Sequence, residues 1–306
     1  MRVADILSLV DSGVIALPEF QRGYVWNRDQ VRYLLRSLYL GHPVGSLLVW
    51  VTSAGTTATR GSEPAGYGTV ELLLDGQQRI TTLYGIVRGR PPAFFHGDAR
   101  AFLNLYFNVE TEVFEFYLPM KMANDPLWIS VTATMQKGAV SCAMPLLAEQ
   151  HPQASTYLKR LNALEKIKER LIHTEKITGE DKTVDVVVDI FNEINSGGTK
   201  LSKGDLALAK LCAARPQARN EMLAQLDGWR KQGFNFELEW LLRCVTAVLT
   251  RKAGFESLKD VSPDNFAAGL GRAGALVDKL LIPRLTDQNP GRSRALCGGP
   301  SASQWG

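Results

Sequence analysis

The sequence predicts a mixed α/β (α+β) fold that begins with alternating strands and helices and ends in a mostly helical region. Apolar runs of strand length alternate with helical spacing up to about residue 150, whereas the stretch from Asn220 to Leu281 has only helical spacing. Of the 306 residues, 45% are hydrophobic and 22% are charged, which is the composition of a globular protein. This length is sufficient for one large domain or two ordinary ones.

Helical spacing and a cap predict the first elements. Residues 1–11 place apolar side chains on one stripe of a short helix, and residues 14–17 follow as a short strand. Asn27 is a typical N-cap for a helix over residues 28–40, because Gln30 follows three residues later and a glycine comes directly after the helix.

The next elements are two buried strands and a helix. Residues 45–51 and 71–74 are apolar runs of strand length, and residues 52–68 between them are rich in Gly, Thr, Ser and Ala, as in a surface loop. A helix follows the second strand directly, over residues 77–88.

Further along the chain, residues 102–107 and 113–118 are predicted to pair as a hairpin. Residues 157–171 have the spacing of an amphipathic helix, residues 183–188 that of a strand, and Ser202 caps a helix through Cys212. The apolar side chains expected to face inward on the 157–171 helix are Leu158, Leu161, Leu164, Ile167 and Leu171.

These elements suggest four regions. Residues 1–150 form a phosphate-binding core with the hairpin, and residues 151–216 add a helix, a strand and a glycine-rich loop. Residues 217–286 form a helical region, and the aperiodic residues 287–306, rich in Gly, Arg, Ser and Pro, are expected to be disordered.

Composition excludes several classes of protein. The net charge of +4 permits contact with nucleic acid without requiring it. The four cysteines and four histidines are scattered, so we expect free thiols and no His/Cys metal site. No signal peptide is apparent, and no apolar run approaches the roughly 20 residues that span a bilayer. We therefore predict a cytoplasmic protein without membrane contact.

The turn at Asp75 is the main candidate site. A buried strand ends there, Gly76 permits a tight turn, and the open amides of the following helix favour an anion. Arg79 adds a planar fork suited to phosphate, Gln77 and Gln78 can hold a water or a sugar hydroxyl, and Asp75 fits Mg²⁺ or a water. Alternatively, Asp75 is a simple helix cap and the rest of the turn is a solvated face.

Two other segments carry candidate ligands. Before the 28–40 helix, Gln21 and Arg22 stand beside aromatic residues, of which Tyr24 and Trp26 could stack on a base; alternatively, the aromatic residues are core anchors. The loop of residues 195–198, Asn-Ser-Gly-Gly, exposes backbone amides near Lys200, so Asn195 and Lys200 could contact a DNA backbone. The alternative is a plain turn between two helices.

Four segments together resemble the N-terminal family of GmrSD-type, modification-dependent restriction proteins, within the ParB/sulfiredoxin-like superfamily. They are residues 18–26 (PEFQRGYVW), 43–46 (PVGS), 74–83 (LDGQQRITTL) and 191–205. Their order and spacing cover roughly the first two-thirds of the chain.

The resemblance implies a ParB/sulfiredoxin-like core that binds a nucleoside triphosphate with Mg²⁺. In that superfamily a Gly-x-x-Arg turn holds phosphates, which Gly76 to Arg79 matches, and an earlier Pro/Gln/Arg box, which residues 18–22 match, faces the same pocket. The family is also implied to act in phage defence against modified DNA. Larger members carry an HNH-type nuclease that needs histidines, and no histidine follows His173 here.

We therefore expect a Mg²⁺-dependent nucleoside triphosphatase domain of a DNA restriction system. Cleavage of DNA would need a partner subunit or a missing C-terminal nuclease module, or would be absent. Arg22 and Arg79 would hold phosphates, Asp75 would hold Mg²⁺, and Gln77 and Gln78 would orient the nucleophile or the ribose. The alternative is a sensor that binds modified DNA without nucleotide turnover. The helical C-terminal third offers an interface for a homo-oligomer.

Overall fold

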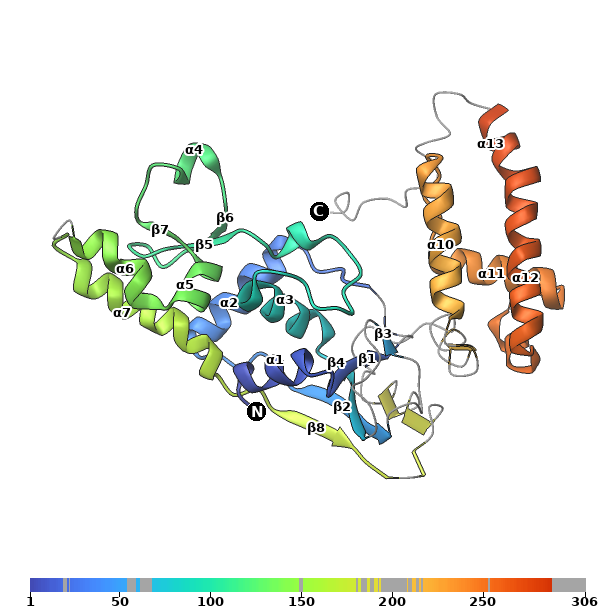
Figure 1. Ribbon diagram of the computed structural model, residues 1–306, viewed down its shortest axis with the longest axis horizontal. Helices are drawn as coiled ribbons and strands as arrows, with labels where there is room; N and C mark the ends of the chain where they lie inside the picture. The colour runs from blue at the N-terminus through green and yellow to red at the C-terminus, as the bar shows by residue number, and fades with distance from the viewer. Residues whose placement is uncertain are drawn as a thin grey trace. The chain divides into compact units, whose positions relative to one another are not determined.

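The computed structural model describes most of the chain and divides it into two units. The described residues are 1–18, 21, 23–53, 59–60, 68–148, 151–179, 181–182, 186–187, 190–191, 193, 208, 211–212, 215, 217–252 and 254–287 (Figure 1). The first unit comprises Met1–Gly55 and Thr59–Asp181, and the second comprises Thr56–Ala58 and Lys182–Gly306.

A mixed sheet of five strands organises the first unit. Its strand order is β3-β1-β4-β2-β8, in which β1 runs parallel to β4, and β2 runs antiparallel to β4 and parallel to β8. The strands are β1 (Ile15–Pro18), β2 (Leu47–Ser53), β3 (Thr59–Arg60), β4 (Thr69–Asp75) and β8 (Thr174–Ile177). The expected boundary near residue 150 therefore lies inside this unit, because β8 pairs with β2.

Three early helices accompany this sheet: α1 (Val3–Asp11), α2 (Arg28–Leu40) and α3 (Gln77–Arg88). Helices α1 and α3 lie on the same side of the sheet (Figure 1). Their buried side chains share one core with Ile15, Val49 and Leu73. The capping box of α2 is confirmed: the Asn27 side chain accepts from the Gln30 amide, and the Gln30 side chain accepts from the Asn27 amide.

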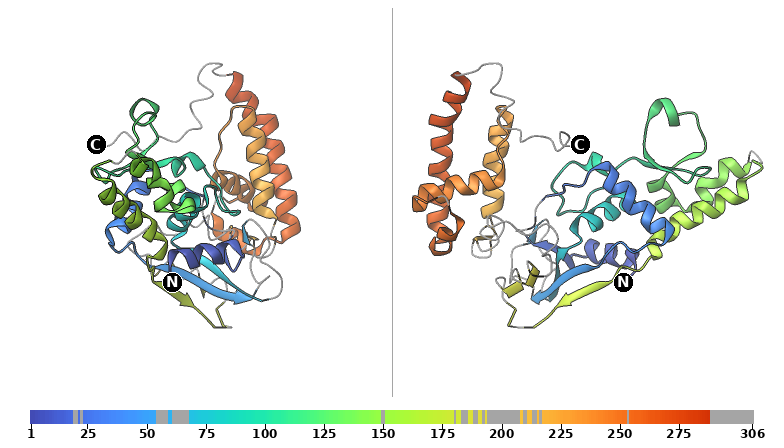
Figure 2. Two further views of the ribbon diagram at one scale, coloured as in Figure 1. Left: turned by 60° about the vertical axis from the view of Figure 1, so that its left-hand side comes forward. Right: turned by 180° about the vertical axis from the view of Figure 1, so that it is seen from behind.

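A second, antiparallel sheet carries the predicted hairpin. Its order is β6-β5-β7, with β5 (Leu105–Asn108), β6 (Phe114–Phe116) and β7 (Trp128–Ser130), which confirms the pairing of β5 with β6. The remaining helical segments of this unit are η1 (Ala99–Ala101), α4 (Pro119–Met122), α5 (Val131–Lys137), α6 (Ala139–Ala148), α7 (Ala154–Glu165) and η2 (Lys166–Glu169). Figure 2 shows α6 and α7 side by side.

The second unit is helical in its described residues. It contains α10 (Ala218–Lys231), α11 (Leu238–Thr250), η3 (Phe255–Asp260), α12 (Pro263–Leu276), the π-helical η4 (Val277–Leu281) and α13 (Ile282–Asp287). Trp229 and Phe266 are fully buried in its own core. Across the described parts of both units, no helix has the length and apolar character needed to cross a bilayer.

Two sequence-based expectations are wrong. Val186 and Val187 lie in a helix, so the strand expected over residues 183–188 does not form at these two described positions. The amphipathic α-helix ends at Glu165, and Leu171 is 77% exposed rather than inward-facing, because it forms a β-bridge with Arg2. The tail from residue 288 onward, expected to be disordered, lies outside the described residues.

Candidate functional site

The turn between β4 and α3 requires a glycine. Gly76 has φ 94° and ψ 6°, a left-handed conformation that side chains disfavour. A Cβ atom at this position would collide with a terminal methyl of Leu47 and lie 3.2 Å from Nη2 of Arg79. A larger residue at position 76 would therefore adopt a strained backbone conformation and displace the ends of the Leu47 and Arg79 side chains.

The first helical turn presents open amides. The Ile80 N–H donates to the Gly76 carbonyl at 3.0 Å, as the first bond of α3. The N–H groups of Gln78 and Arg79 donate to no acceptor among the residues that the structure describes. They stand at the positive end of the helix dipole, which is the local chemistry of an anion site.

The Arg79 guanidinium is largely committed to the protein. Its Nη1 donates to the Val44 carbonyl at 2.6 Å, and its Nη2 donates to the Ser46 carbonyl at 2.7 Å and to Oδ2 of Asp75 at 2.8 Å. The side chain is 14% exposed. Because a guanidinium has five N–H groups, one on Nη1 and the one on Nε have no acceptor among the described residues. Arg79 thus fixes the loop before β2 through three of its five N–H groups.

Asp75 is the acidic group of the turn. Its side chain is 49% exposed, and Oδ2 accepts the bond from Arg79. Its other oxygen has no partner in the described part of the chain. No cluster of three or more potential metal ligands occurs among the described residues. A carboxylate oxygen without a protein partner can accept a hydrogen bond from water or contact a cation.

The segment before α2 is tied to the same turn by two glutamine side chains. Nε2 of Gln21 donates to the carbonyl of Leu74, the residue before Asp75, at 2.7 Å, and Gln21 is buried. Nε2 of Gln78 donates to the Gly23 carbonyl at 3.1 Å. Arg22 itself lies outside the described residues, but both of its sequence neighbours are anchored to the turn.

The aromatic residues of this segment differ in their surroundings. Tyr24 is 8% exposed and its ring centroid lies 5.1 Å from that of Phe102. Its hydroxyl lies 2.8 Å from Oγ1 of Thr82, and burial raises the pKa of Tyr24 to about 12. This placement fits a core anchor rather than a base-stacking residue. Trp26 is half-buried and packs against the same core.

The other candidate residues are placed as follows. Gln77 is buried in the first turn of α3, beside Gln78. Asn195 and Lys200, expected to contact a DNA backbone, lie outside the described residues.

The structure adds three main-chain carbonyl groups that sequence reasoning missed. The carbonyls of Val44 and Ser46 bind Arg79, and the carbonyl of His96 accepts from the Tyr24 N–H at 2.7 Å. Val44 and Ser46 fall within the segment 43–46 already singled out by motif, but main-chain acceptors leave no signal in side-chain identity.

Comparison with known proteins gives two findings. Residues 3–212 match the family described as GmrSD restriction endonuclease, N-terminal domain. The chain is also 33% identical over 90 residues to the uncharacterized protein MJ0686 of Methanocaldococcus jannaschii. That alignment covers 26% of this chain and 16% of the relative, so the chain spans only a small part of that protein's length.

Proposed function

Because this chain belongs to the GmrSD restriction endonuclease N-terminal domain family, a family of restriction systems, we propose that it binds and hydrolyses a nucleoside triphosphate at the β4–α3 turn. One observation carries the proposal. Open main-chain amides, two remaining donors of Arg79 and a half-exposed carboxylate meet at one glycine turn. These are the donor types that phosphate and its Mg²⁺ ion need.

Each residue of the turn then has a role. The amides of Gln78 and Arg79, with the free donors of the Arg79 guanidinium, would bind phosphate oxygens. Asp75 would hold Mg²⁺, whose bound charge offsets that of the phosphates. Gln77 would orient the attacking water or the ribose.

Arg22 would complete the phosphate site. Its sequence neighbours Gln21 and Gly23 are hydrogen-bonded to Leu74 and Gln78, which lie on either side of the turn. Two arginines and two open amides can neutralise much of a triphosphate's charge. Cleavage of DNA would then belong to a separate nuclease component.

The test is phosphate release from each of the four nucleoside triphosphates, with Mg²⁺ and with or without DNA. We expect Asp75→Asn to lower turnover by about 100-fold, because the amide keeps the acceptor for Arg79 but removes the charge that binds Mg²⁺. Asp29→Asn is the matched control: Asp29 is also exposed and paired with an arginine in the next helical turn, at Arg32.

Two results would count against this function. One is wild-type protein that releases no phosphate from any of the four nucleotides. The other is Asp75→Asn protein that keeps full turnover. Salt-sensitive binding to modified DNA without phosphate release would instead support a DNA sensor.

A further inference from the structure

The segment Gly23–Trp26 lacks regular secondary structure. The N–H groups of its last three residues donate to acceptors elsewhere in the chain. The Tyr24 N–H donates to the His96 carbonyl at 2.7 Å. The N–H groups of Val25 and Trp26 both donate to Oε1 of Gln78, at 2.9 and 3.3 Å. Two of the three N–H bonds that hold this segment therefore end on one side chain of α3.

The Gln78 amide is almost fully used in these contacts. Its Oε1 accepts two bonds, its Nε2 donates one to the Gly23 carbonyl, and the side chain is buried. The opposite orientation of the amide would place its NH₂ group against two N–H donors, so the network fixes the assignment. Three of the four hydrogen-bonding positions of this amide are therefore used by the Gly23–Trp26 segment, and one N–H of Nε2 remains.

The main-chain N–H of Gln78 takes no part in these side-chain contacts. Its N–H is one of the two open amides at the start of α3. The same residue therefore presents a main-chain donor to a ligand at the turn and three side-chain bonds to the Gly23–Trp26 segment. Helix α2 begins directly after this segment, at Arg28.

We propose that Gln78 is a positioning residue that couples the phosphate-binding turn to the Gly23–Trp26 segment, so that a ligand on the turn orders this segment and the start of α2. We call the three side-chain bonds from Gln78 to the Gly23–Trp26 segment the clamp. The clamp is seen in the structure, whereas its coupling to a nucleotide rests on the proposed function. Val25 is exposed and Trp26 is half-buried, so ordering of this segment would change the protein surface at these two residues.

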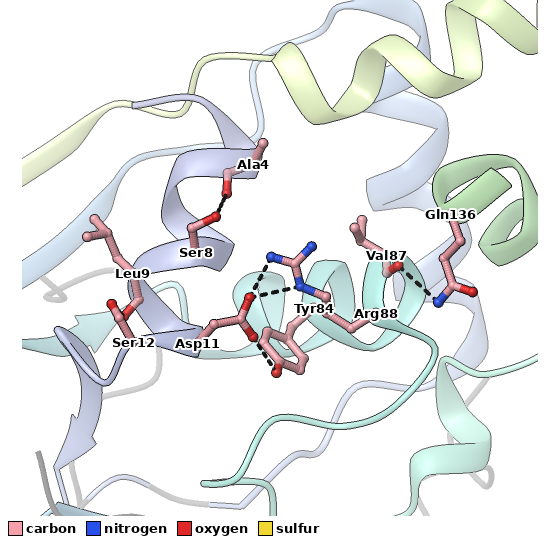
Figure 3. Close-up of polar contacts among 9 residues, drawn as sticks. All are labelled: Ala4, Ser8, Leu9, Asp11, Ser12, Tyr84, Val87, Arg88 and Gln136. Atoms are coloured by element: carbon pink, nitrogen blue, oxygen red, sulfur yellow. Dashed lines mark hydrogen bonds and ion pairs between the residues drawn. The ribbon is translucent and has the colours of Figure 1, made fainter. Parts of the chain in front are cut away.

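Hydrogen exchange at the Val25 and Trp26 amides tests the clamp in the intact chain. Without ligand, Gln78→Met removes the shared acceptor, and we expect these two amides to exchange about tenfold faster. Gln78→Glu introduces a carboxylate oxygen that can still accept from both N–H groups but loses the donor to the Gly23 carbonyl, so it should retain more protection than Gln78→Met. Gln136→Met is the matched control, because the Gln136 side chain donates to the Val87 carbonyl at the other end of α3 (Figure 3).

The coupling is tested by adding Mg²⁺ with each nucleoside triphosphate, and inorganic phosphate as a simpler probe. In wild-type protein a bound ligand should slow exchange at Val25 and Trp26 further, and Gln78→Met should abolish this response. Gln78→Met should also raise KM more than it lowers kcat, because the Gly23–Trp26 segment is no longer held beside the turn whereas the main-chain amide of residue 78 remains.

The outcomes separate this proposal from the proposed function. Unchanged exchange in ligand-free Gln78→Met overturns the clamp whether or not the protein hydrolyses nucleotides. Protected amides in ligand-free wild-type protein, with no turnover, overturn the proposed function and leave the clamp standing. A ligand that binds without slowing exchange at Val25 and Trp26 overturns the coupling.

Discussion

At the scale of single residues, burial distinguishes side chains that pack in the core from side chains that can bind a ligand. Tyr24 follows the Pro/Gln/Arg box of residues 18–22 in sequence, yet its ring packs against Phe95 and Phe102 and its hydroxyl is hydrogen-bonded to Thr82. Thr82 donates its own proton to the carbonyl of Gln78, so the Tyr24 hydroxyl is the donor in the pair. Tyr24 therefore supports the segment that Gln78 clamps.

Tyr24→Phe tests this assignment. We expect the free energy of unfolding to fall by about 1 kcal/mol, because a buried hydrogen bond is lost while the ring packing stays. Urea unfolding measures the change. Tyr33→Phe, on an exposed side chain of α2, should leave the free energy of unfolding unchanged. A loss of DNA binding without any loss of stability would show that Tyr24 is a ligand after all.

At the scale of elements, one carboxylate joins α1 to α3. Oδ1 of Asp11 accepts from the Tyr84 hydroxyl at 2.7 Å, and Oδ2 accepts from Nε and Nη2 of Arg88 at 3.0 and 2.5 Å (Figure 3). Burial raises the pKa of Asp11, but the hydrogen bonds from Tyr84 and Arg88 outweigh it and the pKa lies below its ordinary value. These bonds hold α3, the helix that follows the Gly76 turn, against α1.

The lowered pKa fixes the pH dependence of this contact. The stabilisation is fully present above the unfolded-state pKa, near 4, and is lost as pH falls through the lower folded-state value. We expect Asp11→Asn to lower the free energy of unfolding by about 1 kcal/mol at pH 7, since the pair is partly exposed to solvent.

Urea unfolding from pH 7 down to pH 3 measures this difference, which should shrink below about pH 4. Asp5→Asn, on an exposed residue of the same helix, is the control and should show no such pH dependence. A difference that grows as pH falls would contradict the assignment.

Elements with local signals were predictable from the sequence. Helix α2 has its own N-cap at Asn27 and a left-handed glycine at its end, and α3 begins directly after Gly76. These capping residues lie within one turn of the helix end that they define, so the helix ends can be predicted without knowledge of distant contacts. The turn at Gly76 was predictable for the same reason.

Elements and roles that depend on distant contacts were not predictable. Strand β8 has four residues with a charged centre and forms because it pairs with β2, more than 100 residues earlier. The clamp of Gln78 joins residues 52 to 55 positions apart, so nothing near Gln78 in sequence distinguishes a positioning residue from a ligand. Local spacing also predicted that the α7 helix extends to Leu171, but Leu171 instead forms a β-bridge with Arg2.

At the scale of the whole molecule, each unit has its own core. The described residues Leu208, Leu211 and Cys212 belong to the core of the second unit, with Met222 and Trp229 of α10. The family match ends at residue 212, so its last described helical residues pack with partners beyond it. A boundary near residue 216, which the sequence suggested, would cut through this core.

Truncation tests where the chain divides. A chain ending at residue 181 keeps all of the first core and should unfold cooperatively in urea, with the near-ultraviolet circular dichroism of packed aromatic residues. A chain ending at residue 216 keeps Leu208, Leu211 and Cys212 but loses α10, so it should expose apolar surface, bind the dye ANS and aggregate. The full chain is the control for both. A 216-residue chain that stays monomeric and binds no more dye than the 181-residue chain would show that these three side chains do not need the second core.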